Sequence, residues 1–307
     1  MKALLKNTIA NRALLLMALP SIILLFMFAY VPMFGLVIAF KKFNYVDGIL
    51  GSPWVGINNF KFLFTSASTT WRMIRNTVGY YLLFTILGTI ANIVLALALH
   101  ECINKRFAKI SHTIMILPTF LSWIAMVFIV NALLSMNTGL VNNWLIAMGK
   151  KPVQWYLSAK SWPYILTILS LWKSTGYGSI LYLSALAGMD QELFEAAALD
   201  GATKMQQVRY ITLPMLTSMV CILTLMSLGG IMTSNTGLFY QVTMNTGALY
   251  STTQTIDAYV MNALMNSGTS NFGMTSAVSF FQSAVGCIMV VSVNMLVRRW
   301  EPEYSLF

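Results

Sequence analysis

Six long runs of apolar residues, separated by polar connections, dominate the chain. They cover residues 13–40, 73–99, 113–135, 163–187, 211–234 and 273–297. Each run is long enough for a helix rising about 1.5 Å per residue to cross about 30 Å of hydrocarbon. The runs lack period-two alternation, and a helix satisfies its own backbone polar groups in lipid. The pattern predicts an all-α integral membrane protein with six transmembrane helices in a domain over residues 13–307, preceded by a short segment, 1–12.

Prolines and glycines interrupt several of these runs. Pro20, Pro32, Pro118, Gly176 and Gly178 all lie inside predicted spans. In a membrane bundle, neighbouring helices can satisfy the backbone groups that a proline frees. We therefore expect kinked helices at these positions and not missing ones.

The composition supports a membrane protein and excludes several other classes. Of the 307 residues, 57% are hydrophobic and only 9% are charged, with a mean hydropathy of +0.70, whereas soluble domains carry about 25% charged residues. The net charge is +10, but the basic residues stand singly or in pairs in the connections, which indicates lipid headgroups and not nucleic acid as their partner. The three cysteines form no CxxC pair, and no metal-ligand cluster or catalytic constellation is visible.

Charge alone does not orient the chain. An even number of spans places both termini on one side, with ten Lys and Arg residues on that side and eight on the other. This difference is too small for the positive-inside rule to decide between the two orientations.

One connection, residues 190–212, is acidic and rich in alanine. It holds Asp190, Glu192, Glu195 and Asp200, four of the nine acidic residues. Asp190 is placed as a helix N-cap, with Glu192 in the first turn, and Gly201 suits the left-handed residue that ends a helix. We expect a helix–turn–helix at the membrane surface, its second helix running from 202 to about 210. By physics alone, an ordinary amphipathic connector is an equally good interpretation.

The spacing in this connection resembles a known motif. Glu195-Ala196-Ala197, then Gly201, then Ile211-Thr212-Leu213-Pro214 are similar to the EAA loop of permeases from binding-protein-dependent ABC importers. The segments 17–20, 30–40, 54–60 and 303–307 resemble sugar-importer permeases of the maltose-permease class, most of all its polysaccharide-type, LplB-like subgroup. The resemblance implies the type I importer permease fold, with the loop and both termini in the cytoplasm. The residues that it implies for ATPase coupling are Glu195, Ala196, Ala197, Asp200 and Gly201.

The resemblance also implies partners. Such permeases work with a homologous second permease, two copies of an ABC ATPase and an extracytoplasmic solute-binding protein. No Walker A motif occurs in this chain, so we expect no cofactor here and no enzymatic activity, with ATP and Mg²⁺ bound by the partner ATPases.

A sugar path needs aromatic faces and hydrogen-bonding groups near the middle of the bilayer. Lys173 lies about ten residues from either end of its predicted span, and a charge at that depth usually faces a cavity. Ser170, Lys173, Ser174 and Tyr177 recur at helical spacing, so they share a face, and Trp172 lies beside them. The resemblance adds Ser227, Gly230, Ile231 and Ser234 by position. Lys173 could pair with a cargo carboxylate, or equally well snorkel or bond a backbone carbonyl of the partner permease.

Other interpretations remain at this point. A non-sugar solute within the ABC class is the main competitor; an ion-coupled secondary transporter would need intramembrane carboxylates, and the predicted spans hold none. In segment 235–272 the apolar residues Ile256, Tyr259, Val260, Ala263 and Leu264 recur at helical spacing and predict a short amphipathic helix. The segment is either packing cover or an external gate or docking surface. Four asparagines are expected to join helices more often than to bind solute, namely Asn76, Asn92, Asn131 and Asn294. Glu101 is expected to pair with Lys105 one turn later.

Overall fold

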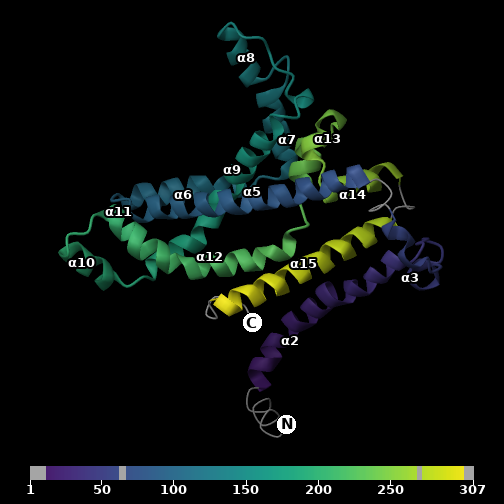
Figure 1. Cartoon of the computed structure of the whole chain (residues 1–307), viewed down its shortest axis with the longest axis horizontal. Helices are drawn as coiled ribbons and strands as arrows, with labels where there is room; N and C mark the ends of the chain where they lie inside the picture. Colours follow the sequence, from purple (N-terminus) through teal and green to yellow (C-terminus); the bar gives the residue numbers. More distant parts are fainter. Residues whose placement is uncertain (1–11, 62–66, 268–271, 301–307) are drawn as a thin grey trace. The chain divides into compact units, whose positions relative to one another are not determined.

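The computed structural model describes residues 12–61, 67–267 and 272–300, and Figure 1 shows the course of the chain. Most of these residues are helical, and within these ranges the only β pairing is an isolated bridge between Lys41 and Trp54. The chain divides into two compact units, residues 1–65 with 264–281, and 66–263 with 282–307. Residues 1–11 of the predicted N-terminal segment and the tail 303–307 lie outside the described residues.

The first unit is built on one long apolar rod. Helix α2 (Arg12–Leu25) continues through a π turn, η1 (Phe26–Tyr30), into a 3₁₀ segment, η2 (Val31–Phe40), with Pro32 at its start. Within it, Leu16–Phe40 is long and apolar enough to cross a membrane, and its large side chains are mostly exposed, as lipid contact requires. The short helices α3 (Gly48–Gly51) and η3 (Gly56–Phe60) follow. Lys41 is buried and its Nζ donates to the carbonyls of Ile49 and Leu50 at 2.9 and 2.8 Å.

The second unit is a helical bundle arranged around α9. Helix α5 (Ala67–His100) runs along α9 (Trp162–Ala187), and α6 (Lys105–Phe120) packs against the same helix (Figure 1). Helix α12 (Leu213–Ser227) continues into the 3₁₀ turn η6 (Leu228–Gly230), and α15 (Phe272–Trp300) is the last helix. The α6–α9 crossing is very close, because a Cβ atom on Gly176 would lie 1.9 Å from the carbonyl oxygen of Met115.

The run 113–135, expected as a single span, is a broken one. Helix α6 ends at Phe120, two residues after Pro118, and α7 (Trp123–Leu134) leaves it at an angle of 101°. The side chain of Ser122 caps α7 by accepting from the backbone of Ala125 at 3.1 Å. Four described helices qualify as membrane spans, or five if this bent pair is one span. The all-α membrane fold is confirmed, whereas the predicted count of six is not; α9 is long enough but carries Ser170, Lys173 and Ser174.

The connection between α7 and α9 contains the short helices α8 (Leu140–Ala147) and η4 (Trp155–Leu157). Asn142, which is fully buried, organises it. Its Nδ2 donates to the carbonyls of Ser135, Met136 and Val153, and its Oδ1 accepts from the backbone of Val153 and the indole of Trp155. One amide thereby satisfies the backbone of a connection that has little regular structure.

Residues 235–263 fold back into the bundle. They form η7 (Gly237–Val242), η8 (Gly247–Leu249), α13 (Tyr250–Thr253) and the start of α14 (Ile256–Ser267), a helix where amphipathic spacing predicts one. Leu238, Phe239, Val242 and Leu249 are buried in one cluster with Tyr80, Trp162 and Leu166. On α5, Asn76 donates to the carbonyl of Gln254 at 3.1 Å, as expected of an amide that joins helices.

The close α6–α9 crossing gives a first prediction. Gly176→Ala would place a methyl group against the backbone of Met115. We expect the free energy of unfolding to fall by about 1–3 kcal/mol. The matched change is Gly79→Ala, because a Cβ atom at Gly79 would meet nothing within 4 Å. It is expected to leave the free energy of unfolding unchanged or to raise it by up to about 1 kcal/mol through helix propensity. Denaturant unfolding of the detergent-solubilised protein measures both, and equal stability of the two variants would contradict the packing argument.

Candidate functional site

The acidic connection forms two short helices. Helix α10 (Gln191–Leu199) starts at Asp190, whose carboxylate accepts from the backbone of Glu192 at 3.0 Å, as predicted for an N-cap. Gly201 has a φ of +82° and ends this turn, also as predicted. Helix α11 (Lys204–Gln207) follows, capped by Thr203 and Gln206 in a capping box, and it passes through a π turn, η5 (Val208–Thr212), into α12. The second helix is thus not a separate short one, as the sequence suggests, but the beginning of a continuous helical run, Lys204–Gly230, that includes α12.

Most of this loop faces outward. Glu195, Ala196, Asp200 and Gly201 are exposed and Ala197 is half-buried. Leu199 is 90% exposed, although it is a large apolar residue at the end of α10. An exposed leucine between two carboxylates, with alanines that allow close approach, is a surface suited to another protein.

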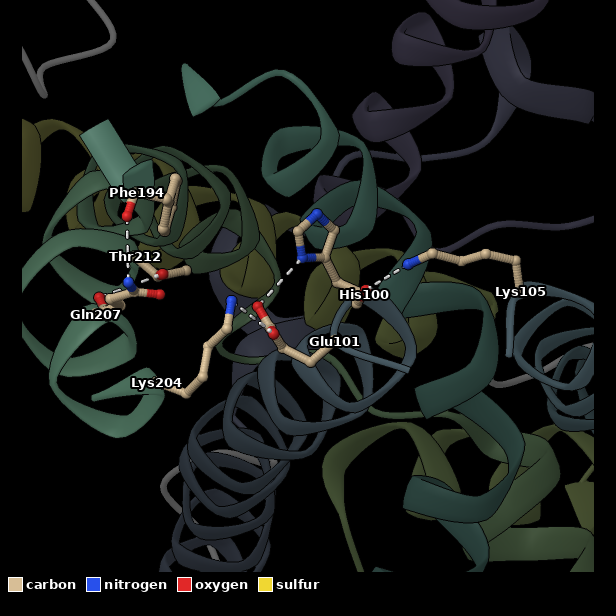
Figure 2. A network of polar contacts seen from close by, with 7 residues as sticks. All are labelled: His100, Glu101, Lys105, Phe194, Lys204, Gln207 and Thr212. Carbon is tan, nitrogen blue, oxygen red and sulfur yellow. Dashed lines mark hydrogen bonds and ion pairs between the residues drawn. The ribbon is translucent and has the colours of Figure 1, made fainter. Parts of the chain in front are cut away.

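A polar network ties this loop to the end of α5 (Figure 2). Glu101 accepts an ion pair from Lys204 of α11 at 3.4 Å and lies 3.7 Å from Nδ1 of His100. Lys105 donates to the carbonyl of His100 at 2.8 Å, so the expected Glu101–Lys105 pair is wrong. The cause is that α5 ends at His100 and α6 begins at Lys105, so the two residues do not share a helix.

A second link holds the loop to itself. Gln207 donates from Nε2 to the carbonyl of Phe194 at 3.2 Å, which joins α11 to α10. Phe194 packs beside Leu186 and Met189 in a cluster at the end of α9. The loop is therefore seated on the end of α9 by apolar packing and steadied by polar contacts. The exposed Glu101–Lys204 pair adds at most about 1 kcal/mol.

A cavity of the second unit lies among α5, α9, the α6–α7 break and residues 233–239. Its volume is about 510 Å³. Its lining is rich in aromatic rings, hydroxyls and amides, and Lys173 is the one charged side chain among the described residues that line it. The lining residues are Thr77, Tyr80, Tyr81, Phe84, Thr85, Asn92, Thr119, Trp123, Ser170, Lys173, Ser174, Tyr177, Gly178, Thr233, Ser234, Asn235, Leu238 and Phe239.

The structure brings together some of the residues predicted for a substrate path. Those that line this cavity are Ser170, Lys173, Ser174, Tyr177 and Ser234. Ser227 lines a neighbouring pocket, where its hydroxyl lies 2.7 Å from that of Tyr81.

The other three predicted path residues lie elsewhere. Trp172 is half-exposed and outside the cavity lining. Gly230 ends η6, and Ile231 is buried in a cluster with Leu225 and Leu228. Gly230 and Ile231 follow the end of α12 at Ser227, so the spacing of a regular helix does not predict which way they face.

Lys173 has a definite set of partners. Its Nζ donates to the carbonyls of Pro118 at 3.0 Å, of Thr119 at 2.9 Å, and of Leu121. The ammonium also lies 5.2 Å from the ring centroid of Trp123. In return, Thr119 donates its hydroxyl to the carbonyl of Lys173 at 2.7 Å. Lys173 thus caps the broken end of α6 in its own chain.

Residues on α5 form a face of the cavity that sequence reasoning missed. Thr77, Tyr80, Phe84 and Thr85 fall on one side of that helix. Their spacing of three and four residues, with rings and hydroxyls mixed inside an apolar span, is a signal that could have found them. Asn235 and Phe239 come from the returning segment and carry no such signal.

Asp257 fixes the position of Ser234 at the edge of the cavity. Its carboxylate accepts from the backbone and hydroxyl of Ser234 at 2.6 and 3.1 Å, and from the Gln282 amide at 3.2 Å. The Asp257 carboxylate therefore bonds Ser234 and Gln282, and Asp257 itself does not line the cavity. No group of three His, Cys, Asp or Glu side chains that could hold a metal exists within the part of the chain that the structure describes.

Comparison with known proteins gives one consistent result. A model of the family described as "Binding-protein-dependent transport system inner membrane component" matches residues 85–302. The chain is 32% identical over 302 residues to the polygalacturonan/rhamnogalacturonan transport system permease protein YteP of Bacillus subtilis, covering 98% of this chain and 92% of that protein. It is 31% identical over 294 residues to protein LplB of the same organism, covering 95% and 91%.

Solved structures agree with these sequence relatives. A chain in the crystal structure of a bacterial ABC transporter involved in the import of the acidic polysaccharide alginate matches with a TM-score of 0.83 and 32% identity, covering 97% of this chain and 99% of that one. A chain of a bacterial alginate ABC transporter in complex with an alginate pentasaccharide-bound periplasmic protein matches with a TM-score of 0.82 and 30% identity, covering 96% of each.

The cap on the broken helix gives a second prediction. Lys173→Met keeps the length of the side chain but removes the donor to the carbonyls at the end of α6, those of Pro118, Thr119 and Leu121. We expect the free energy of unfolding to fall by about 2–3 kcal/mol. Lys173→Arg keeps the charge and donors and is expected to lose less than half as much. Denaturant unfolding in detergent checks both values. A methionine variant as stable as the wild type would contradict the capping role.

Proposed function

The chain belongs to the family of binding-protein-dependent transport system inner membrane components, and on that premise we propose that it forms half of the translocation pathway of an ATP-driven oligosaccharide importer. It is a multi-pass membrane permease. The proposal extends this to the cargo, the partners and the orientation: the loop 190–212 and both termini lie in the cytoplasm, and the cavity takes sugar from an extracytoplasmic binding protein.

One observation carries the proposal: α9 contributes to both functional regions. The helix presents Ser170, Lys173, Ser174 and Tyr177 to the cavity, and its other end leads through Gly188 and Met189 into α10. A force applied to the loop therefore reaches the cavity wall through a single rigid element. Such a connection suits a transporter that couples ATP hydrolysis in another subunit to a change in the cavity.

The cavity chemistry suits a carbohydrate. Tyr81 and Trp123 offer rings against which a sugar can stack, and Thr85, Ser170 and Ser174 offer hydroxyls for its hydroxyl groups. At about 510 Å³ the cavity is in the range of small-ligand sites. YteP is named as a permease for polygalacturonan/rhamnogalacturonan transport, and the matching solved chain belongs to a transporter involved in the import of the acidic polysaccharide alginate. Lys173 is a fixed positive charge in the lining, so an oligosaccharide that carries uronate groups is the cargo we propose.

The partners follow from the family and from the exposed loop. We propose a homologous second permease, two copies of an ABC ATPase that bind ATP and Mg²⁺, and an extracytoplasmic solute-binding protein. Glu195, Ala196, Ala197, Asp200 and Gly201 would contact the ATPase, since this surface has an exposed leucine and two carboxylates available for a partner. No step of ATP hydrolysis is assigned to this chain.

A non-sugar solute is the second candidate for the cargo. The mixture of rings and hydroxyls would also admit a peptide or a polyol. The absence of carboxylates from the described lining of the cavity disfavours an ion-coupled mechanism, which usually relies on such groups.

The direct test is import by the assembled complex. The chain is co-purified with its native partners, reconstituted in liposomes with ATP inside, and supplied with binding protein and uronate oligosaccharides. We expect ATP-dependent accumulation of uronate oligosaccharides, with neutral oligosaccharides of equal length at least about tenfold slower, the ratio that one favourable charge interaction supports. ATP-dependent uptake of a peptide or polyol and of no oligosaccharide would overturn the proposal.

The loop gives a separate prediction. Gly201 has a left-handed backbone that a β-branched residue does not adopt without strain, so Gly201→Val is expected to shift the exposed end of α10. Import and binding-protein-stimulated ATP hydrolysis should fall together by about tenfold, as expected for strain of about 1–2 kcal/mol. Gly149→Val is the matched control, because Gly149 also has a positive φ of 74° and open space around it, far from the loop. Unchanged ATPase stimulation in the Gly201 variant would contradict a coupling role for the loop.

A further inference from the structure

The cavity among α5 and α9 continues into a second pocket. This second pocket has a volume of about 250 Å³ and shares five lining residues with the first: Phe84, Thr85, Asn92, Ser174 and Gly178. Beyond them it is lined by further polar side chains, namely Thr89, Tyr182, Thr224 and Ser227. Leu181 and Leu223 complete its lining together with Gly88, so the two pockets form one path of mixed polar and apolar character along α5, α9 and α12.

Asn92 and Gly178 face each other where the two pockets meet. A Cβ atom on Gly178 would lie 2.5 Å from Nδ2 and 2.7 Å from Oδ1 of Asn92. The amide of Asn92 thus fills the space that the missing side chain of Gly178 leaves open. Both residues line both pockets, so the amide lies where the two pockets adjoin.

The amide is also incompletely bonded. Its Oδ1 is shielded from solvent and accepts no hydrogen bond from the residues that the structure describes. A buried acceptor without a donor costs free energy, and native proteins keep such groups mainly where they serve a function. Because Oδ1 is shielded, a cargo hydroxyl supplies the missing donor only after the amide turns toward the path.

The depth of this point is the same on the two helices. Asn92 lies eight residues before the end of α5 at His100, and Gly178 nine residues before the end of α9 at Ala187. At 1.5 Å per residue both are roughly 12–14 Å from the end of the bundle that carries the loop. Lys173 and Tyr177, which line only the larger cavity, lie farther from the loop than this level, as do Phe84, Thr85 and Ser174, which line both pockets. Tyr182, which lines only the second pocket, lies nearer the loop.

We propose that Asn92 is a cargo-contacting gate between the two pockets, and that Gly178 provides the space in which its amide turns. The inference rests on the proposed function and adds to it the point at which sugar leaves the larger cavity. An amide both donates and accepts hydrogen bonds, so it can exchange its contacts with successive hydroxyls of an oligosaccharide. The amide carries no charge, so it does not bind a uronate group tightly enough to slow its passage.

The test uses the reconstituted importer and a pair of coupled variants. Gly178→Ala places a methyl group against the Asn92 amide, and import of a uronate oligosaccharide is expected to fall by about tenfold. The double variant Gly178→Ala with Asn92→Ala removes the amide that the methyl group meets. Asn92→Ala alone also removes the hydrogen bonds of the amide and is expected to slow import by about tenfold. The double variant should import within about threefold of Asn92→Ala alone, whereas independent effects would multiply to about a hundredfold.

Two further variants separate a gate from a packing contact. Asn92→Leu keeps the size of the side chain and removes its hydrogen bonds, and it should slow import by about tenfold while binding-protein-stimulated ATP hydrolysis stays within about twofold of wild type. Gly79→Ala on α5, which meets open space, should leave both rates unchanged. A variant that fails to fold would lose its ATPase stimulation as well, and the double variant then serves as the decisive measurement.

The outcomes distinguish failure of the proposed importer function from failure of the proposed gate. If the wild type accumulates no oligosaccharide, the proposed function fails. If the wild type imports normally and Gly178→Ala or Asn92→Leu does so too, the gate is wrong and the function stands. A double variant that imports about a hundredfold more slowly than the wild type, as independent effects would give, would equally overturn the gate.

Discussion

The structure of the second unit depends on how the broken end of α6 is satisfied. Lipid offers no hydrogen bonds to the carbonyl groups that a break in a helix frees, so a break is tolerated only where the protein supplies the donors. Here a single side chain does so, because Lys173 donates to the carbonyls of Pro118, Thr119 and Leu121. The positive charge also lies at the negative end of a helix dipole. This contact permits the 101° bend that carries α7 away from α6.

The bend and the close helix crossing together make the cavity. Gly176 lets α6 approach the backbone of α9, and the hydroxyl of Thr119 fixes the register between them by donating to Lys173. The turn into α7 then places Trp123 and Thr119 in the cavity wall. Because α9 also leads directly into α10, the same helix that shapes the cavity receives any movement of the loop. Cavity and loop are therefore mechanically joined within one chain.

The sequence located the membrane spans and the loop better than the individual side-chain contacts. Asp190 and Gly201 were predictable because N-caps and left-handed turns are set by a few adjacent residues. The partner of Glu101 was not, since Lys204 is about a hundred positions away and reaches it only because α11 folds back to the end of α5. The position of Ile231 was not predictable either, because a 3₁₀ turn at Leu228–Gly230 follows α12 and Ile231 packs into an apolar cluster.

By itself the sequence determined that the chain is a helical membrane protein with an exposed acidic loop, because hydropathy and helix-capping chemistry are local properties. It also fixed which residues of α9 share a face, since helical spacing requires only the residue numbers. The tertiary structure alone decided that Lys173 bonds carbonyls of its own chain, that α5 supplies much of the cavity wall, and that Asn92 meets Gly178. The physical reason is that spacing defines the face of one helix but not the helix that it meets, which depends on packing over the whole bundle.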